Sequence, residues 1–316
     1  MELINFDSSQ RIRAKLTLEQ QKEIKALYRR ISKQLAEKIS KLQQGEKISG
    51  VVNLQYLTSM KNNIDKELDK IEKYLDSSIP TNMEKMVETV IKDNADKMGA
   101  LGLDIRGAFS SLPASIVESI ISGQLYNTDW SLSKAIWRHT KKSKSDINTI
   151  IAEGIALNKS TYDIAKDLEK YVNPSAKKPW DWSKMYPGTN KVVDYNAQRL
   201  ANTMISHAYQ QAFVQTTKDN PFFDAYRWNI SNSHREVCEI CKNRAQEYHG
   251  VSINGKMMRG VYRKDELPID HPNGQCTVSL VMSKSMDDVV NDIANWYKSP
   301  EGTYPKIDKF VKQLEV

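Results

Sequence analysis

Residues 237–276 read VCEICKNRAQEYHGVSINGKMMRGVYRKDELPIDHPNGQC, and they include all three cysteines of the chain. Cys238 and Cys241 are two residues apart, the spacing at which a tight turn presents two thiolates to one metal ion. His271 and Cys276 follow as a second pair in DHPNGQC (270–276). Between the pairs, SINGKM (252–257) contains the Asn-Gly signal of a β-hairpin. We expect this hairpin to return the second pair to the first.

The chemistry of these side chains favours zinc. Three thiolates and one imidazole make a closed, tetrahedral donor set, which is typical of structural zinc and leaves no open position for catalysis. Such a site contributes on the order of 10 kcal/mol to the folding of a small module. The predicted Zn²⁺ ligands are Cys238, Cys241, His271 and Cys276. His249 and His234 remain alternative ligands, and Asp270 is a candidate hydrogen-bond partner of a ligating histidine. The competing interpretation is three reduced, buried cysteines beside an incidental histidine.

Apolar residues in the N-terminal part of the chain recur with the period of an α-helix over long stretches. Two apolar stripes recur at steps of three or four residues, which predicts two amphipathic helices forming a hairpin. We expect residues 45–50 to end the first helix and residues 77–80, which include Pro80, to end the second. A third helix is predicted over 81–97, with Thr81 as its cap. The stripes are Ile24, Leu27, Ile31, Leu35, Ile39 and Leu42, and then Leu54, Leu57, Ile64, Leu68, Ile71 and Leu75.

Further helices are expected in the middle of the chain, over 113–121, around Leu132 and Ile136, over 147–157 with Asp146 as cap, over 161–172 after Ser160, and over 195–218. Residues 173–190 are rich in Pro and Trp and predict a linker or an ordered flap. A strand over 224–230 begins a mixed module, and a last helix covers 286–297. Five tryptophans are expected to anchor cores or partner contacts: Trp130, Trp137, Trp180, Trp182 and Trp228.

These elements predict a mainly α protein, with an elongated helical N-terminal part and a small zinc-stabilised α/β module near the C-terminus. Four consecutive segments follow from them. Residues 1–122 form a long-helix region and 123–220 a helical core with the flap. Residues 221–285 form the zinc-binding module, and 286–316 the C-terminal helix and tail.

Charge is concentrated at the front of the 316-residue chain. The net charge is +7, and residues 1–50 carry 11 Lys or Arg against 6 Asp or Glu. Such a segment can attract DNA or an acidic protein surface without reading bases, although alternating Lys and Glu are also typical of a solvated helix face. No apolar run approaches the roughly 18 residues of a membrane span, and the first residues lack the apolar core of a signal peptide. We therefore expect a reducing cytoplasm as the first location.

Catalytic patterns are scarce in the sequence. The helical HExxH pattern, a glycine-rich phosphate loop and a GxSxG elbow are all absent, and the chain has 5 histidines. A zinc-framed nuclease with His249 as its base is the enzymatic alternative. The pair of helices over 147–172 carries balanced charges on its second helix, which disfavours sequence-specific DNA binding. The sequence predicts a protein that is not an enzyme.

Several segments in a fixed order resemble the minor head proteins of tailed bacteriophages, the Mu-type head-morphogenesis family. They are YNTDWSLSKAIW (126–137), IIAEGIALNKSTYDIAKDLEKYV (150–172) and DYNAQRLANTMISHAYQQA (194–212). The terminal signature of that family is a tryptophan strand, CxxC, His-Pro and cysteine, matched here by Trp228, Cys238, Cys241, His271-Pro272 and Cys276. The resemblance covers residues 120–282.

Two positions depart from the family pattern. Gly274 stands where the inner cysteine of the usual HPxCxC ending would be, so Cys276 alone completes the ligand set. Asn202, Thr203 and Met204 stand where many relatives carry an Arg-Thr-Glu run. Any role tied to that charged triad is therefore not expected here.

The resemblance implies a structural protein of the virion that takes part in head morphogenesis. Its implied partners are the portal protein and the major capsid or scaffold proteins. Non-specific contact with packaged DNA is expected from the basic front segment instead. Its implied location is the capsid interior near the portal, after the host cytoplasm in which it is made. The alternative is a zinc-framed nuclease or transferase acting during phage assembly or DNA ejection.

Overall fold

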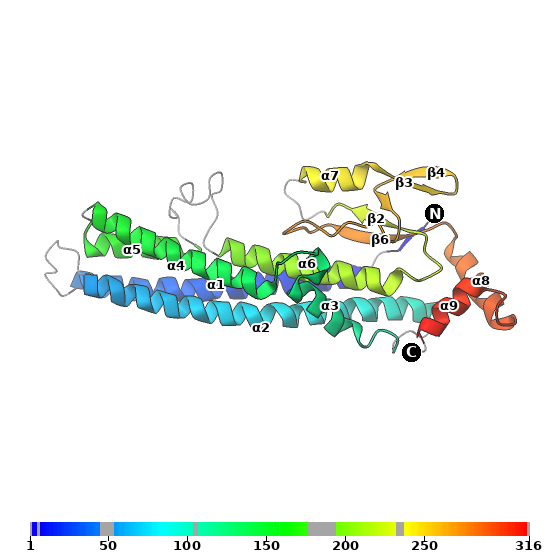
Figure 1. Cartoon of the computed structure of the whole chain (residues 1–316), viewed down its shortest axis with the longest axis horizontal. Helices are drawn as coiled ribbons and strands as arrows, with labels where there is room; N and C mark the ends of the chain where they lie inside the picture. Colours follow the sequence, from blue (N-terminus) through cyan, green and yellow to red (C-terminus); the bar gives the residue numbers. More distant parts are fainter. Residues whose placement is uncertain are drawn as a thin grey trace. The chain divides into compact units, whose positions relative to one another are not determined.

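The computed structural model describes residues 2–4, 7–44, 54–103, 107–157, 159–175, 194–231 and 237–314. The chain is mainly helical, with small antiparallel sheets built largely from its C-terminal part, as the sequence predicts (Figure 1). It divides into two compact units. The first unit collects Met1–Leu16, Pro80–Asn127 and Asn202–Val316, and the second collects Thr17–Ile79 and Thr128–Ala201. Each unit thus joins segments that are far apart in sequence, whereas the four predicted segments are consecutive ranges.

Long helices supply most of the second unit. It contains most of α1 (Asp7–Gln44), the first half of α2 (Leu54–Ala100), α4 (Leu132–Ala156) and α5 (Thr161–Val172), and the start of α6 (Tyr195–Thr217). The apolar stripes predicted from the sequence are buried where they are described, with Ile24, Ile31 and Leu35 at most 2% exposed, except at Leu27, which is half-buried. The side chains of Leu42 and Leu54 and the predicted break at 45–50 lie outside the described residues.

The prediction that α2 ends at residues 77–80 is wrong, because the helix runs without interruption to Ala100 with Pro80 inside it. Proline removes one backbone donor but keeps a helical φ. The apolar stripe continues through this point, with Leu75, Ile79 and Met83 all fully buried. Burial of three large side chains outweighs the loss of one hydrogen bond. The helix predicted over 81–97 is therefore the second half of α2.

The prediction that Asp146 caps a new helix is also wrong, since α4 runs from Leu132 through this residue to Ala156. The Asp146 side chain is buried, and its Oδ2 accepts a hydrogen bond of 3.0 Å from the hydroxyl of Tyr171 in α5. The carboxylate thus ties two helices together. Ser160 does cap α5 as predicted, accepting a hydrogen bond from the backbone N–H of Asp163. Asn158, which directly follows the predicted helix over 147–157, lies outside the described residues.

The first unit holds the strands. Its four-stranded sheet has the order β1-β6-β2-β5 and is antiparallel throughout, with β1 (Glu2–Ile4), β2 (Ala225–Asn229), β5 (Val261–Tyr262) and β6 (Thr277–Met282). The predicted strand at 224–230 is confirmed as β2. In Figure 1 the orange β6 lies beside β2, and in the register Trp228 faces Val278. The three-residue β1 was not predicted, because its partner is almost three hundred residues away in sequence.

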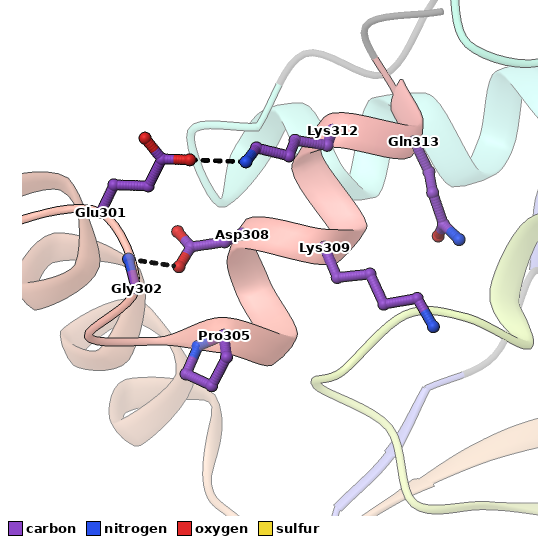
Figure 2. A pocket seen from close by; sticks show the side chains of 7 residues that line it. All are labelled: Glu301, Gly302, Pro305, Asp308, Lys309, Lys312 and Gln313. Carbon is purple, nitrogen blue, oxygen red and sulfur yellow. Dashed lines mark hydrogen bonds and ion pairs between the residues drawn. The ribbon is translucent and has the colours of Figure 1, made fainter.

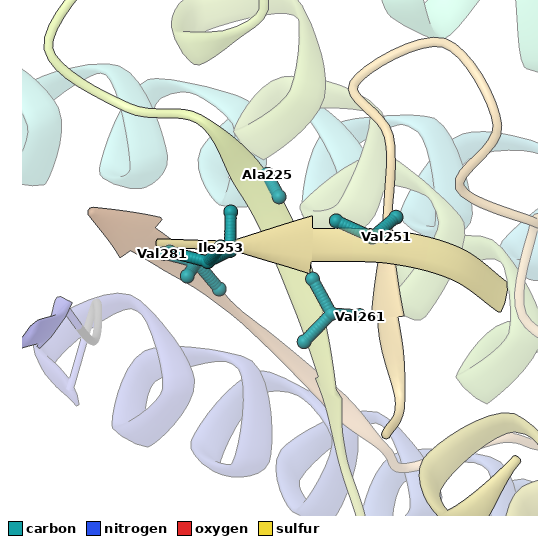
Figure 3. Close-up of a cluster of buried hydrophobic side chains, with 5 residues drawn as sticks. All are labelled: Ala225, Val251, Ile253, Val261 and Val281. Atoms are coloured by element: carbon teal, nitrogen blue, oxygen red, sulfur yellow. The ribbon is translucent and has the colours of Figure 1, made fainter. Parts of the chain in front are cut away.

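A hairpin packs over this sheet. It consists of β3 (Tyr248–Ile253) and β4 (Lys256–Arg259), joined at Asn254 and Gly255 with φ of 51° and 76°. Both turn residues are left-handed, as a two-residue hairpin turn requires, so the Asn-Gly prediction is confirmed. Figure 3 shows the side chains that meet between hairpin and sheet, and they are all buried: Ala225, Val251, Ile253, Val261 and Val281.

Helices complete the first unit: α3 (Leu112–Ser122), the short 3₁₀ turn η1 (Gln124–Tyr126), α7 (Glu239–Gln246), α8 (Met286–Lys298) and α9 (Pro305–Leu314). The predicted helix 286–297 is confirmed as α8, which begins with a capping box between Ser285 and Asp288. The sequence prediction did not include α9, which contacts α8 through a hydrogen bond of 2.7 Å from Trp296 Nε1 to Asp308. Within the described residues, every helix is too short or too polar to cross a membrane.

Candidate metal centre

Three of the four predicted ligands come together in the first unit. The donor atoms of Cys238, Cys241 and His271 all lie within 4.8 Å of one another. His271 Nε2 is 3.3 Å from Cys238 Sγ and 3.0 Å from Cys241 Sγ. The fourth predicted ligand, Cys276, adjoins this group through Cys241, with the two sulfur atoms 3.3 Å apart. The group could hold a metal ion, as the sequence predicts.

The start of α7 presents the first two thiols. Cys238 is the N-cap of α7, and its Sγ accepts a hydrogen bond of 3.4 Å from the backbone N–H of Cys241. A helix N-terminus favours negative charge, so this position suits a thiolate. Cys241 is fully buried and Cys238 is exposed. The pair therefore presents one thiol from inside the fold and one from its surface.

The ring of His271 is oriented for ligation. Its Nδ1 lies 3.1 Å from the carbonyl oxygen of Pro272, and the carbonyl can only accept, so Nδ1 carries the proton. This tautomer leaves a lone pair on Nε2, the atom that faces both thiols. A backbone acceptor on the second ring nitrogen is the usual arrangement for a metal-ligating histidine.

The spacing of the donors is close to that of a filled site. Tetrahedral zinc with Zn–S of about 2.3 Å and Zn–N of about 2.0 Å places S and N about 3.5 Å apart and two sulfurs about 3.8 Å apart. The distances from Cys241 Sγ to His271 Nε2 and to Cys276 Sγ are 3.0 and 3.3 Å. These two distances would have to widen by a few tenths of an ångström, whereas Cys276 stands outside the group of three donors that lie within 4.8 Å of one another and would have to move closer to the others.

Burial governs the charges at the site. It raises the pKa of the Cys241 thiol, and the neighbouring thiols of Cys276 and Cys238 raise it further. The metal-free thiol therefore keeps its proton, and a bound cation would displace it. Burial likewise raises the pKa of the Asp270 carboxyl, against the opposing effects of His271 and Arg244.

The position of the Asp270 carboxylate requires a glycine at position 274. The Asp270 carboxylate accepts a hydrogen bond of 2.8 Å from the backbone N–H of His271, so it holds the backbone of this residue, whereas the ring nitrogen Nδ1 faces the carbonyl of Pro272. A Cβ added at Gly274 would lie 2.1 Å from Oδ2 of this carboxylate. A side chain at position 274 is therefore excluded while Asp270 keeps its place.

The remaining candidate residues lie elsewhere. His249 stacks on Tyr262 with ring centroids 4.0 Å apart, and its Nε2 is 3.2 Å from the carbonyl oxygen of Arg244. Its ring therefore packs between α7 and β5 and is not part of the donor group. His234, Trp180, Trp182 and most of the predicted flap 173–190 lie outside the described residues.

The described tryptophans differ in burial. Trp228 is buried on β2, with the Arg244 guanidinium 4.7 Å from its ring centroid, and it serves as the expected core anchor. Trp130 is half-buried. Trp137 is 51% exposed and stacks with the ammonium group of Lys141, so it is not a core residue of its unit.

A surface hollow beside α9 is a weaker candidate (Figure 2). Three of its charged side chains pair locally: Lys312 with Glu301 at 2.5 Å, and Asp308 with the backbone N–H of Gly302 at 2.9 Å. It contains no histidine or thiol. The cysteine and histidine group is the site with the more specific chemistry.

Fold and site together define a mainly helical protein with small antiparallel sheets and a Cys-Cys-His group that could bind a metal ion. No protein-family model, no curated protein and no solved structure matches the chain. The particular function is therefore argued from the site and from the sequence motifs.

Proposed function

We propose that Cys238, Cys241, His271 and Cys276 bind one structural Zn²⁺. The observation that carries this proposal is the convergence of His271 Nε2 on the thiols of Cys241 and Cys238, which lie 30 and 33 residues away in sequence and 3.0 and 3.3 Å away in space. Three thiolates and one imidazole fill a tetrahedral site completely. The centre would pin the start of α7 to the loop 268–276, and it would leave no position for a catalytic water.

We also propose that the protein is a structural component of a bacteriophage head, a minor head protein acting with the portal and with capsid or scaffold proteins. Its support is the order of the motifs at 126–137, 150–172 and 194–212, followed by the tryptophan strand and the zinc ligands. The basic front segment suits non-specific contact with packaged DNA. The protein would work in the capsid interior near the portal after synthesis in the host cytoplasm.

Metal analysis tests the zinc centre. We expect one Zn²⁺ per purified chain, and strong chelation should lower the melting temperature because the metal binds only the folded state. Cys241→Ser should abolish stoichiometric binding. His249→Gln is the matched control, since this histidine lies in the same module but outside the donor group, and it should bind as the wild type does. A wild-type protein without zinc or with the same melting temperature after chelation contradicts the proposal.

Particle analysis tests the head role. Mass spectrometry of gradient-purified phage particles should detect the chain, in a ratio to portal subunits that is constant between preparations. Purified chain should also bind isolated portal protein. Its absence from intact particles would overturn this part of the proposal and leave the zinc centre standing.

A further inference from the structure

One face of α6 is polar although it is buried. Thr203, Ser206, His207 and Gln210 follow each other at helical steps of three, one and three residues, and each is at most 6% exposed. Buried polar side chains are costly unless they are hydrogen-bonded. The partners of this face therefore indicate its role.

The partners lie in the loop 268–274, which carries His271. Thr203 Oγ1 accepts a hydrogen bond of 2.8 Å from the Asn273 backbone N–H. Ser206 Oγ donates to the carbonyl oxygen of Gly274 at 2.9 Å. The helix thus holds the backbone on the C-terminal side of His271.

The N-terminal side of His271 is held by the next turn of α6. Gln210 donates through Nε2 to the carbonyl of Pro268 at 2.7 Å and accepts from the Asp270 backbone N–H at 2.8 Å. His207 Nε2 donates to the carbonyl of Asp270 at 3.0 Å. The side chains of Gln210 and His207 therefore hold the backbone at Pro268 and Asp270, just before the ligand.

The orientation of His207 is itself determined. The Tyr126 hydroxyl lies 2.6 Å from Nδ1 of His207, so it donates to this nitrogen while Nε2–H faces the loop. From α1, Arg13 donates to the carbonyl oxygens of Gln275 and Cys276, both at 2.9 Å. Backbone groups on both sides of His271, and that of Cys276 itself, are thus bound by side chains that do not ligate the metal.

We propose that this polar face of α6 positions His271 before the metal arrives, so that Thr203, Ser206, His207 and Gln210 are positioning residues of a preformed metal site, while Arg13 of α1 holds the backbone of Cys276. The inference rests on the proposed zinc centre. A preformed loop loses less conformational freedom on binding, which raises metal affinity. None of these residues needs to touch the ion.

Thr203→Val and Ser206→Ala together remove two loop contacts while nearly conserving volume. We expect the double variant to bind Zn²⁺ about tenfold more weakly than wild type in competition with a chromophoric chelator. The single substitution Thr203→Ser keeps both hydroxyl groups, so this variant should bind Zn²⁺ with wild-type affinity. Thr216→Val is the matched control, because this buried threonine of α6 bonds to helix carbonyls at Ala212 and Phe213 and not to the loop.

A metal-independent measurement accompanies the titration. In metal-free wild-type protein the amides of Asp270 and Asn273 should be protected from hydrogen exchange, and the double variant should lose protection at Asn273. In the Co²⁺-loaded double variant, a weaker or shifted d–d absorption would report the displaced ligands. A melting temperature alone would not separate positioning from a general loss of stability.

The outcomes separate the two proposals. Wild-type protein that binds neither Zn²⁺ nor Co²⁺ overturns the zinc centre, and the positioning role falls with it. Wild-type binding with an unchanged affinity in the double variant overturns the positioning role alone. So does a loop whose amides exchange freely until zinc is added.

Discussion

Position 274 illustrates how one residue sets the composition of the site. The buried carboxylate of Asp270 occupies the space that a side chain at 274 would need, and the same carboxylate holds the backbone N–H of His271 at 2.8 Å. Introducing a cysteine at 274 would therefore displace Asp270 and disturb His271, and it would not add a donor to the group.

We expect both Gly274→Ala and Gly274→Cys to weaken zinc binding and to lower the free energy of unfolding by about 1–3 kcal/mol, because overpacking forces Asp270 from its place. Chelator competition and denaturant titration measure these effects. Gly107→Ala, where an added Cβ meets nothing within 4 Å, is the control. Tighter zinc binding in Gly274→Cys would contradict the steric argument.

At the scale of elements, α4 and α5 approach each other closely at Gly154. A Cβ at this position would lie 2.5 Å from Cγ1 of Ile164, which is fully buried on α5. A helical glycine normally costs about 1 kcal/mol relative to alanine. Its presence here is explained by packing between the two helices.

Gly154→Ala should therefore destabilise the protein by about 1–2 kcal/mol, since overpacking exceeds the gain in helix propensity. Gly99→Ala in α2, where no atom lies within 4 Å of the added Cβ, should be neutral or slightly stabilising. Chemical denaturation followed by circular dichroism compares the two. Equal stabilisation by both substitutions would show that α4 and α5 have room for the methyl group.

At the scale of the whole molecule, a half-buried histidine in the second unit makes the free energy of unfolding depend on pH. His139 Nε2 lies 2.7 Å from the Tyr28 hydroxyl, and desolvation by burial lowers the pKa of His139 to about 4. Between pH 6.5 and 4 the unfolded chain binds a proton that the folded chain does not. The contribution of His139 to the free energy of unfolding is therefore fully present above pH 6.5 and decreases as the pH falls towards 4.

The loss should reach at most about 3 kcal/mol by pH 4, and partial exposure of the residue reduces it below this bound. His139→Gln removes the titrating group, so the stability difference between wild type and variant should shrink as the pH falls from 6.5 to 4. Denaturant titrations at several pH values measure this difference, in which protonation of the metal ligands cancels. Parallel stability curves would contradict the burial of a neutral His139.

The sequence by itself determined the features that depend on neighbouring residues. The helical stripes, the Ser160 cap, the Asn-Gly hairpin and the choice of ligands follow from side chains within a few positions of one another, whose effects are local. From these features the sequence predicted the fold class and the three donors that the structure gathers, Cys238, Cys241 and His271. The fourth predicted ligand, Cys276, contacts Cys241.

Only the tertiary structure decided what depends on distant partners. The passage of α2 through Pro80 rests on burial of an apolar stripe, and the place of Asp146 inside α4 rests on Tyr171. The bonds from α6 to the ligand loop join residues about sixty or seventy positions apart. Contacts of that separation leave no periodicity in the sequence, because their energy arises only when the chain has brought the partners together.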